Sequence, residues 1–203
     1  MRTGIVLTIL ALLPTILIAM TSFTRIVIVL SMVRHAFGMP ETPPNSVLVS
    51  LALFLTMFSM APVAGELNRQ AVEPYLDGRM QLDIAMERGS APLRRFMLAQ
   101  TRQEDLATVY RAAHTPLPRR SSEVELAKLV PAFIINELRV AFTIGFVILL
   151  PFLLIDLVVS AILLSLGMMM VPPTTISLPI KLLMFVLVDG WSLIILGVLG
   201  SFR

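Results

Sequence analysis

Apolar residues gather in four long runs, and most charged residues gather in one block between the second run and the third. The first run covers residues 5–33 with a polar interruption at 21–25, and the second covers residues 46–64. The third run ends at Leu166, and the fourth covers residues 180–199. About 20 apolar residues in helical conformation cross the hydrocarbon core of a bilayer, so each run predicts a hydrophobic helix of spanning length.

This pattern divides the chain into three segments. Residues 1–65 are expected to form an N-terminal hydrophobic helical hairpin, residues 66–128 a polar helical insert, and residues 129–203 a C-terminal hydrophobic helical hairpin. The insert carries 19 of the chain's 29 charges, ten basic and nine acidic, and such a balanced mixture is typical of a solvated surface. The expected fold class is all-α, a membrane-associated protein of helical hairpins.

Inside the insert, residues 90–92 (Ser-Ala-Pro) predict the start of a helix, since serine caps helices and proline is tolerated in the first turn. The apolar residues that follow fall mostly on one helical face; they are Leu93, Phe96, Met97, Leu106, Val109 and Tyr110. Residues 115–122 contain two prolines and an arginine pair and predict a loop. The insert is too small and polar to hold an active-site cleft alone, so we interpret it as a docking element.

Composition agrees with a membrane protein. Of the 203 residues, 57% are hydrophobic and 14% are charged, well below the roughly 25% charged residues of a soluble domain. The formal net charge of +3 indicates contact with anionic lipid or a topological signal, because no basic run with interleaved aromatic residues supports nucleic-acid binding. The absence of cysteine excludes disulfides and thiol catalysis, and two histidines far apart argue against a metal site; no cofactor is expected.

The N-terminus begins as a signal peptide does, with Arg2 before an apolar run. The apolar segment is too long for one, and no small-residue cleavage site closes it, so we expect a structural helix. Arg25 and Arg34 lie in the segment 22–45 between the first two runs. The positive-inside rule then places that segment in the cytoplasm and the polar insert on the periplasmic side.

A methionine triplet separates the third apolar run from the fourth. Gly167 allows a helix to end, and Pro172 and Pro173 cannot continue one, so Met168–Met170 are predicted at a tight break between two hydrophobic arms. Methionine is flexible and polarizable and adapts to surfaces of varying shape. The triplet is therefore interpreted either as a deformable seal or simply as apolar residues in a membrane loop.

Ionisable side chains stand within or beside the apolar runs: Arg25, Glu137, Arg139, Asp156, Lys181 and Asp189. A charge at the bilayer centre costs on the order of 3 kcal/mol on insertion scales, so such groups are paired, protonated or exposed to water. Asp156 or Asp189 is expected to meet Lys181 or Arg139, within one subunit or across subunits. A structural ion pair that holds an oligomer is preferred over a proton or ion path and over simple solvation at the interface.

Arg25 leaves two interpretations open, since its long side chain can extend to the lipid headgroups or pair with an acid on another helix or subunit. Asp156 and Asp189 also raise the hypothesis of an intramembrane aspartyl protease, in which two carboxylates share a proton. Those enzymes carry Gly-x-Gly-Asp, whereas this chain has Val188-Asp189-Gly190, and Ile155 precedes Asp156 instead of a tyrosine. We therefore expect a protein without catalytic activity.

Several stretches in fixed order carry a family resemblance: Met20-Thr21-Ser22-Phe23-Thr24-Arg25-Ile26, Pro92-Leu93-Arg94-Arg95-Phe96-Met97-Leu98, Glu137-Leu138-Arg139-Val140-Ala141-Phe142, Pro151-Phe152-Leu153-Leu154-Ile155-Asp156, Leu166-Gly167-Met168-Met169-Met170 and Leu187-Val188-Asp189-Gly190-Trp191. Together they resemble the FliP family of flagellar export-gate proteins, whose injectisome counterpart is the SctR family. The resemblance covers essentially the whole chain, and the first two stretches resemble the flagellar branch. Asn136 and Arg139 stand where a serine and a lysine are usual. Many members also begin with a cleaved signal peptide and a polar lead, which this chain does not show.

The resemblance implies a subunit of the flagellar type III secretion apparatus in the bacterial inner membrane, at the basal body. Several copies would assemble with the FliQ and FliR subunits, near FlhB and FlhA, into a pore for unfolded flagellar proteins. Hydrophobic hairpins in that family pack within the complex, so protein neighbours would surround the buried charges. The family's methionine loop constricts the pore, and that role carries over to Met168, Met169 and Met170. The rival hypothesis is an ion or proton channel subunit that uses Asp156 and Asp189.

Overall fold

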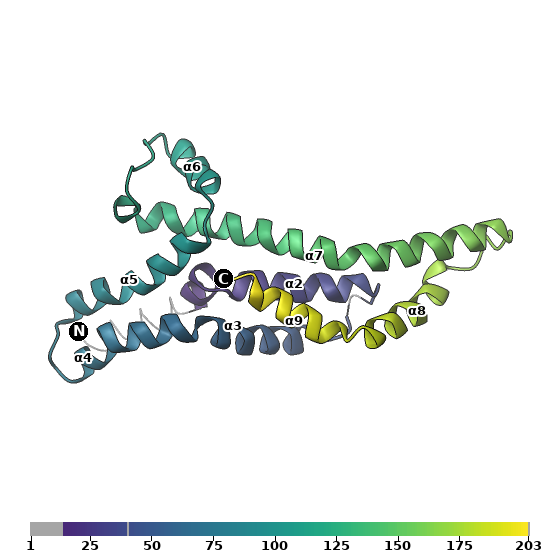
Figure 1. The fold of residues 1–203 in the computed structure, drawn as a ribbon, viewed down its shortest axis with the longest axis horizontal. Coiled ribbons are helices and arrows are strands. Elements are labelled where there is room, and N and C mark those ends of the chain that lie inside the picture. The colour runs from purple at the N-terminus through teal and green to yellow at the C-terminus, as the bar shows by residue number, and fades with distance from the viewer. Residues whose placement is uncertain (1–13, 40, 203) are drawn as a thin grey trace. The chain divides into compact units, whose positions relative to one another are not determined.

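The computed structural model describes residues 14–39 and 41–202 of the chain and contains no strand within these ranges, so the all-α prediction is confirmed (Figure 1). The predicted N-terminal helix lies partly outside the described residues. The expectation that the first apolar segment is a structural helix and not a signal peptide also concerns residues outside them. The helices are Pro14–Met20, α2 (Phe23–Ala36), α3 (Asn45–Leu67), the π-helix η1 (Asn68–Val72), α4 (Glu73–Leu76), α5 (Leu82–Gln100), α6 (Gln103–Ala112), the 3₁₀ turn η2 (Ser121–Glu123), α7 (Leu126–Ser165), α8 (Pro173–Leu187) and α9 (Gly190–Gly200).

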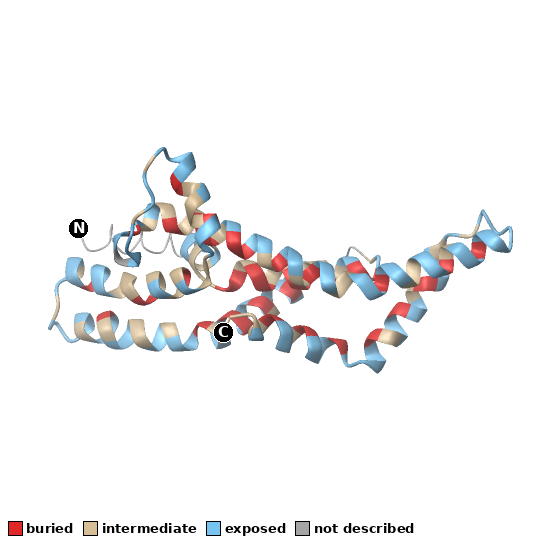
Figure 2. Cartoon of the chain, turned by 45° about the horizontal axis from the view of Figure 1, so that its top comes forward, coloured by how far each residue is buried: buried red, intermediate tan, exposed pale blue. Residues whose placement is uncertain are grey.

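Two described helices are long and apolar enough to cross a membrane: the continuous helix Asn45–Leu76 and α7. Two broken helix pairs extend this to as many as four spans, Pro14–Met20 with α2 and α8 with α9, the latter bent by 66°. Only 28% and 17% of the most apolar windows of the two long helices are buried (Figure 2). Such extensive apolar exposure indicates that lipid or other protein chains cover these helices.

Contacts divide the chain into two compact units. One contains residues 14–24 and Phe54–Arg139, and the other contains Arg25–Leu53 and Val140–Arg203. Each unit therefore draws on both halves of the sequence. The predicted division into residues 1–65, 66–128 and 129–203 follows the hydropathy of the chain. That these segments are separate structural domains stays a prediction.

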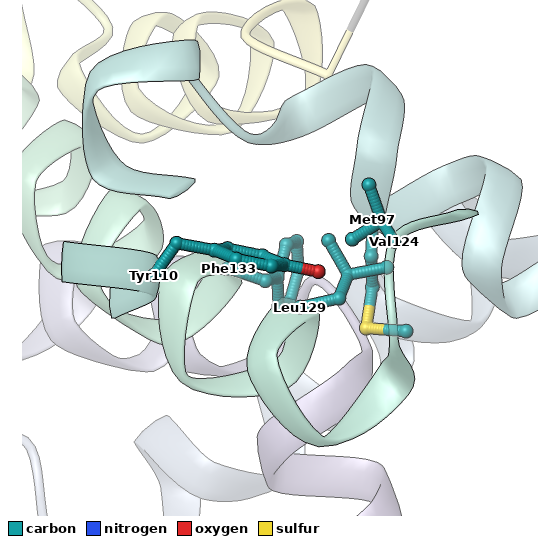
Figure 3. Packing of buried hydrophobic residues seen from close by; sticks show 5 residues of the cluster. All are labelled: Met97, Tyr110, Val124, Leu129 and Phe133. Carbon is teal, nitrogen blue, oxygen red and sulfur yellow. The ribbon is translucent and has the colours of Figure 1, made fainter. Parts of the chain in front are cut away.

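The core of the first unit lies where α5, α6 and the start of α7 meet (Figure 3). Its buried members are Met97, Tyr110, Val124, Leu129 and Phe133. The Tyr110 hydroxyl accepts a hydrogen bond from the Glu125 backbone N–H at 3.2 Å, and the Lys128 ammonium lies 4.8 Å from the Tyr110 ring centroid. Tyr110 thus satisfies a backbone donor at the start of α7, which fixes this helix end against α6.

The predicted helix start at residues 90–92 is wrong, because α5 begins at Leu82 and contains Pro92 in its interior. The residues before Pro92 include strong helix formers, and Asp83 adds a negative charge to the first turn. Proline removes one helical N–H, and neighbouring turns keep the helix continuous here. The single apolar face is in fact shared by two helices, since the chain turns at Thr101–Arg102 between α5 and α6.

Candidate functional site

The methionine loop, residues 166–172, joins α7 to α8, and the predicted helix break is confirmed. Gly167 has φ +74°, the left-handed conformation that glycine adopts without a steric penalty. The Met168 N–H donates to Leu163 O at 2.9 Å and the Gly167 N–H to Leu164 O at 3.1 Å. This pair of bonds is the Schellman motif, which satisfies the last carbonyls of α7 and turns the chain away.

The other side of the loop is set by two prolines. Pro172 has φ −62° and ψ 124° and precedes the first residue of α8, Pro173. Proline suits the first helical position, because its missing N–H would have no partner there and its φ is already helical. Gly167, Pro172 and Pro173 therefore shape the loop by local backbone chemistry alone.

The three methionines project from this loop without burial in the chain. Met168 is 43% exposed, Met169 is 81% exposed and Met170 is 97% exposed. Exposure rises along the triplet, so the last two side chains make almost no contact with the rest of the protein. A seal made from them requires further copies or partners, and that role stays a prediction.

Asp156 on α7 and Lys181 on α8 form an ion pair within the chain, one of the pairings that the sequence left open. The Lys181 Nζ lies 2.6 Å from Asp156 Oδ2 and also donates to Ala36 O at the C-terminus of α2, at 3.0 Å. The Lys181 side chain is 4% exposed and that of Asp156 is 36% exposed. A cation at a helix C-terminus is stabilising, and the loss of Asp156 would leave a nearly buried ammonium group with the Ala36 carbonyl as its remaining acceptor within the described residues.

Arg139 forms an ion pair with Asp105 of α6, an acid that the sequence-based expectation did not include. Its guanidinium lies 2.6 Å from Asp105 Oδ1, and Asp105 is 1% exposed. One turn earlier on α7, Asn136 Nδ2 donates to Gln100 O at 2.6 Å. The junction between α5 and α6 is thus held on α7 by polar contacts. Sequence reasoning missed Asp105, because it is one of nine acids in a charge-balanced insert.

Arg25 is buried and contacts the C-terminal end of α9. Its guanidinium donates to the Ser201 carbonyl at 2.8 Å and to Ser201 Oγ at 2.9 Å, and it stacks on the Phe202 ring with 3.9 Å to the centroid. A guanidinium at this position complements the negative end of the helix dipole. Ser201 and Phe202 were not predicted as partners of Arg25, because neither side chain carries a charge.

The remaining two ionisable residues have different surroundings. Glu137 is fully buried on α7. Asp189 is exposed, has φ +49°, and joins α8 to α9, where its carbonyl accepts the Leu193 N–H at 3.2 Å. Lys181 and Asp189 are eight residues apart, about 12 Å along a helix. Asp189 and Asp156 therefore do not form a carboxylate pair within the chain, and intersubunit pairing of Asp189 stays a prediction.

An aromatic cluster holds α8 against the end of α2, α7 and α9. The Phe185 ring lies 5.0 Å from Phe37, 6.3 Å from Phe152 and 5.4 Å from Trp191, measured between centroids. A Cβ placed on Gly190 would lie 2.2 Å from two carbon atoms of the Phe185 ring. The glycine thus leaves the room that this ring occupies.

Replacing Gly190 by alanine is expected to destabilise the protein by about 1–3 kcal/mol, because the Phe185 ring must leave its three aromatic neighbours. Gly197→Ala on the same helix is the matched control, since a Cβ there meets nothing within 4 Å. Thermal unfolding in detergent checks this: the first variant should melt earlier, and the second should melt at or above the parent temperature. Equal melting of the two variants would contradict the packing described.

The fold and the loop define an all-helical membrane protein whose two longest hydrophobic helices each reach spanning length. Within that class, the sequence model of the FliP family matches residues 6–198. The chain therefore belongs to the FliP family, and the resemblance inferred from its motifs is confirmed.

Curated relatives carry the name flagellar biosynthetic protein FliP. The relative from Pectobacterium carotovorum is 51% identical over 99% of this chain and 78% of its own length, and that from Bacillus subtilis is 50% identical over 98% and 90%. A Buchnera aphidicola relative is 50% identical, and the chain spans 56% of its length. Similarity at this level over nearly all of the chain extends well beyond the methionine loop.

Proposed function

We propose that this chain is an export-gate subunit of the flagellar type III secretion apparatus. Several copies, with FliQ and FliR subunits and close to FlhB and FlhA, form a pore through which unfolded flagellar proteins cross the bacterial inner membrane. The polar insert then lies on the periplasmic side, and the subunit has no catalytic role. Membership of the FliP family and the two helices of membrane-spanning length support this proposal.

The observation that carries the gate function is the exposure of Met169 and Met170 at the end of the α7–α8 hairpin. Exposure of two large apolar side chains to water is unfavourable, and these side chains become buried when loops from several copies meet. Methionine suits a contact that must close, admit a passing polypeptide and close again, since it has three rotatable bonds and no branch. The loop thus acts as one subunit's share of a seal.

Replacing Met168, Met169 and Met170 by alanine should make the assembled complex leak ions at rest while export continues at least partly. Alanine removes the long side chains that close the pore and leaves Gly167 and both prolines to shape the loop. Conductance of reconstituted complexes, with secretion of a flagellar subunit alongside, checks this. Met57→Ala with Met86→Ala is the control, because both methionines are exposed but lie outside the loop. An unchanged resting conductance in the triple variant would refute the gate.

A further inference from the structure

We propose that the ion pair of Asp156 and Lys181 positions the methionine loop, so that these two residues set how tightly the gate closes. The inference rests on the proposed gate function and adds the contacts that control it. Ala36 of α2, Asp156 of α7, Lys181 of α8 and the loop all belong to the second unit.

The register of the hairpin places the pair close to the loop on both helices. Asp156 lies nine positions before the last residue of α7, and Lys181 lies eight positions after the first residue of α8. At 1.5 Å per residue, the pair lies about 12–14 Å from the loop along each arm. Four residues further from the loop on each helix, Phe152 and Phe185 meet with 6.3 Å between their centroids. Among the side-chain hydrogen bonds between α7 and α8 in the described residues, the bond of Lys181 with Asp156 is therefore the one nearest the loop.

Lys181 also ties the hairpin to a third helix. Its ammonium group donates to the Ala36 carbonyl at the C-terminus of α2 at 3.0 Å, in addition to its bond with Asp156. The two acceptors come from different helices, so one nearly buried ammonium fixes α8 relative to both. Displacement of Lys181 would release the α8 arm, which is continuous with Pro173 and the loop.

Two buried polar atoms on the facing helices α7 and α8 have no hydrogen-bond partner among the described residues. They are Asp156 Oδ1 and the Ser177 hydroxyl, and Ser177 lies one turn before Lys181 on the same face of α8. A partly satisfied buried network is less stable than a complete one, and it has alternatives available when the helices move. The ion pair therefore holds α7 and α8 in one relative position, although nearby polar atoms still lack hydrogen bonds in that position.

Nearer the loop, few side chains hold the arms. Val159 and Leu163 of α7 and Ser177 of α8 are buried, whereas Ile162, Leu164 and Leu166 are more than half exposed. This part of the hairpin lacks aromatic contacts such as that of Phe152 with Phe185, which lies on the side of the ion pair away from the loop. Its position is accordingly sensitive to the loss of the Asp156–Lys181 bond.

Asp156→Asn tests the inference, because it removes the charge that holds Lys181 and keeps the shape of the side chain. The chain has no cysteine, so Leu166→Cys, 67% exposed beside the triplet, accepts a single nitroxide spin label. In the assembled complex with its membrane partners, Asp156→Asn should broaden the label distances between copies. It should also raise the resting conductance about tenfold, within the range of ordinary allosteric couplings.

Two further variants separate positioning from folding. Asp105→Asn breaks a pair of the same length, 2.6 Å, that also has one buried and one half-exposed partner, and its arginine, Arg139, comes 26 positions before the last residue of α7. It should leave the label distances and the conductance unchanged. Asp156→Leu with Lys181→Met replaces the pair by apolar contacts, which generally preserve folding, and should restore both readouts towards the parent. If Asp156→Asn does not assemble, Lys181→Met alone replaces it in the comparison.

Unchanged label distances in Asp156→Asn, or an equal change in Asp105→Asn, would overturn the inference. A failure of the gate itself gives a different result. In that case the complex with alanine at positions 168, 169 and 170 would not leak ions, whereas the label distances at residue 166 would still change when the ion pair is broken. If the triplet leaks and the label does not move, the gate stands and the positioning role of Asp156 and Lys181 is wrong.

Discussion

Phe133→Ala is expected to lower the free energy of unfolding by about 3–5 kcal/mol, the usual cost of emptying a large aromatic site in a closed core. Phe133 is 0% exposed, and its ring lies 5.8 Å from that of Phe96 in an edge-to-face arrangement. The truncation would leave a cavity between α5 and α7, beside the contact of Tyr110 with Glu125. Chemical denaturation in detergent measures the change.

Phe142→Ala provides the comparison on the same helix. Phe142 is 56% exposed, so the same truncation there should change the unfolding free energy by no more than about 0.5 kcal/mol. Equal destabilisation by the two substitutions would mean that the core of the first unit does not depend on Phe133.

Arg25→Met should detach the C-terminal end of α9, with a loss of roughly 3 kcal/mol. The guanidinium supplies two hydrogen bonds to Ser201 and a stacking contact with Phe202, and hydrogen bonds to charged groups contribute about 1.5–3 kcal/mol each without being additive. Hydrogen exchange of the last turn of α9 reports the change directly, because its amides exchange faster once that end is free.

Ser201→Ala serves as the graded control for Arg25. It removes the hydroxyl acceptor but keeps the backbone carbonyl, so the expected loss is about 1 kcal/mol and the exchange of α9 should accelerate only slightly. Unchanged protection of α9 in Arg25→Met would contradict the role assigned to this arginine.

Local sequence chemistry accounts for the features that were predicted correctly. Apolar run length predicts the long helices, because every backbone polar group in an apolar setting needs a partner within its own helix. Glycine at 167 and prolines at 172 and 173 predict the loop, because these residues restrict or permit particular backbone angles whatever surrounds them. The same reasoning misplaced a helix start at Pro92, where favourable residues before the proline outweighed its missing donor.

Partners of charged residues could not be predicted in the same way. The Asp105–Arg139 bond joins residues 34 positions apart, and the bond from Arg25 to Ser201 joins residues 176 positions apart. Each depends on how a helix is rotated about its axis and which neighbour it packs against. For Lys181 the sequence offered two acids, and only the packing of α7 on α8 selected Asp156.

Hydropathy and the positions of glycine and proline thus specify the long helices and the break at the methionine triplet, because these properties arise within a few consecutive residues. The tertiary structure decides which charges meet, that α2, α7 and α8 share one ammonium group, and that Arg25 holds the end of α9. Such contacts require side chains from distant segments to converge, and their energies depend on burial that no single segment provides.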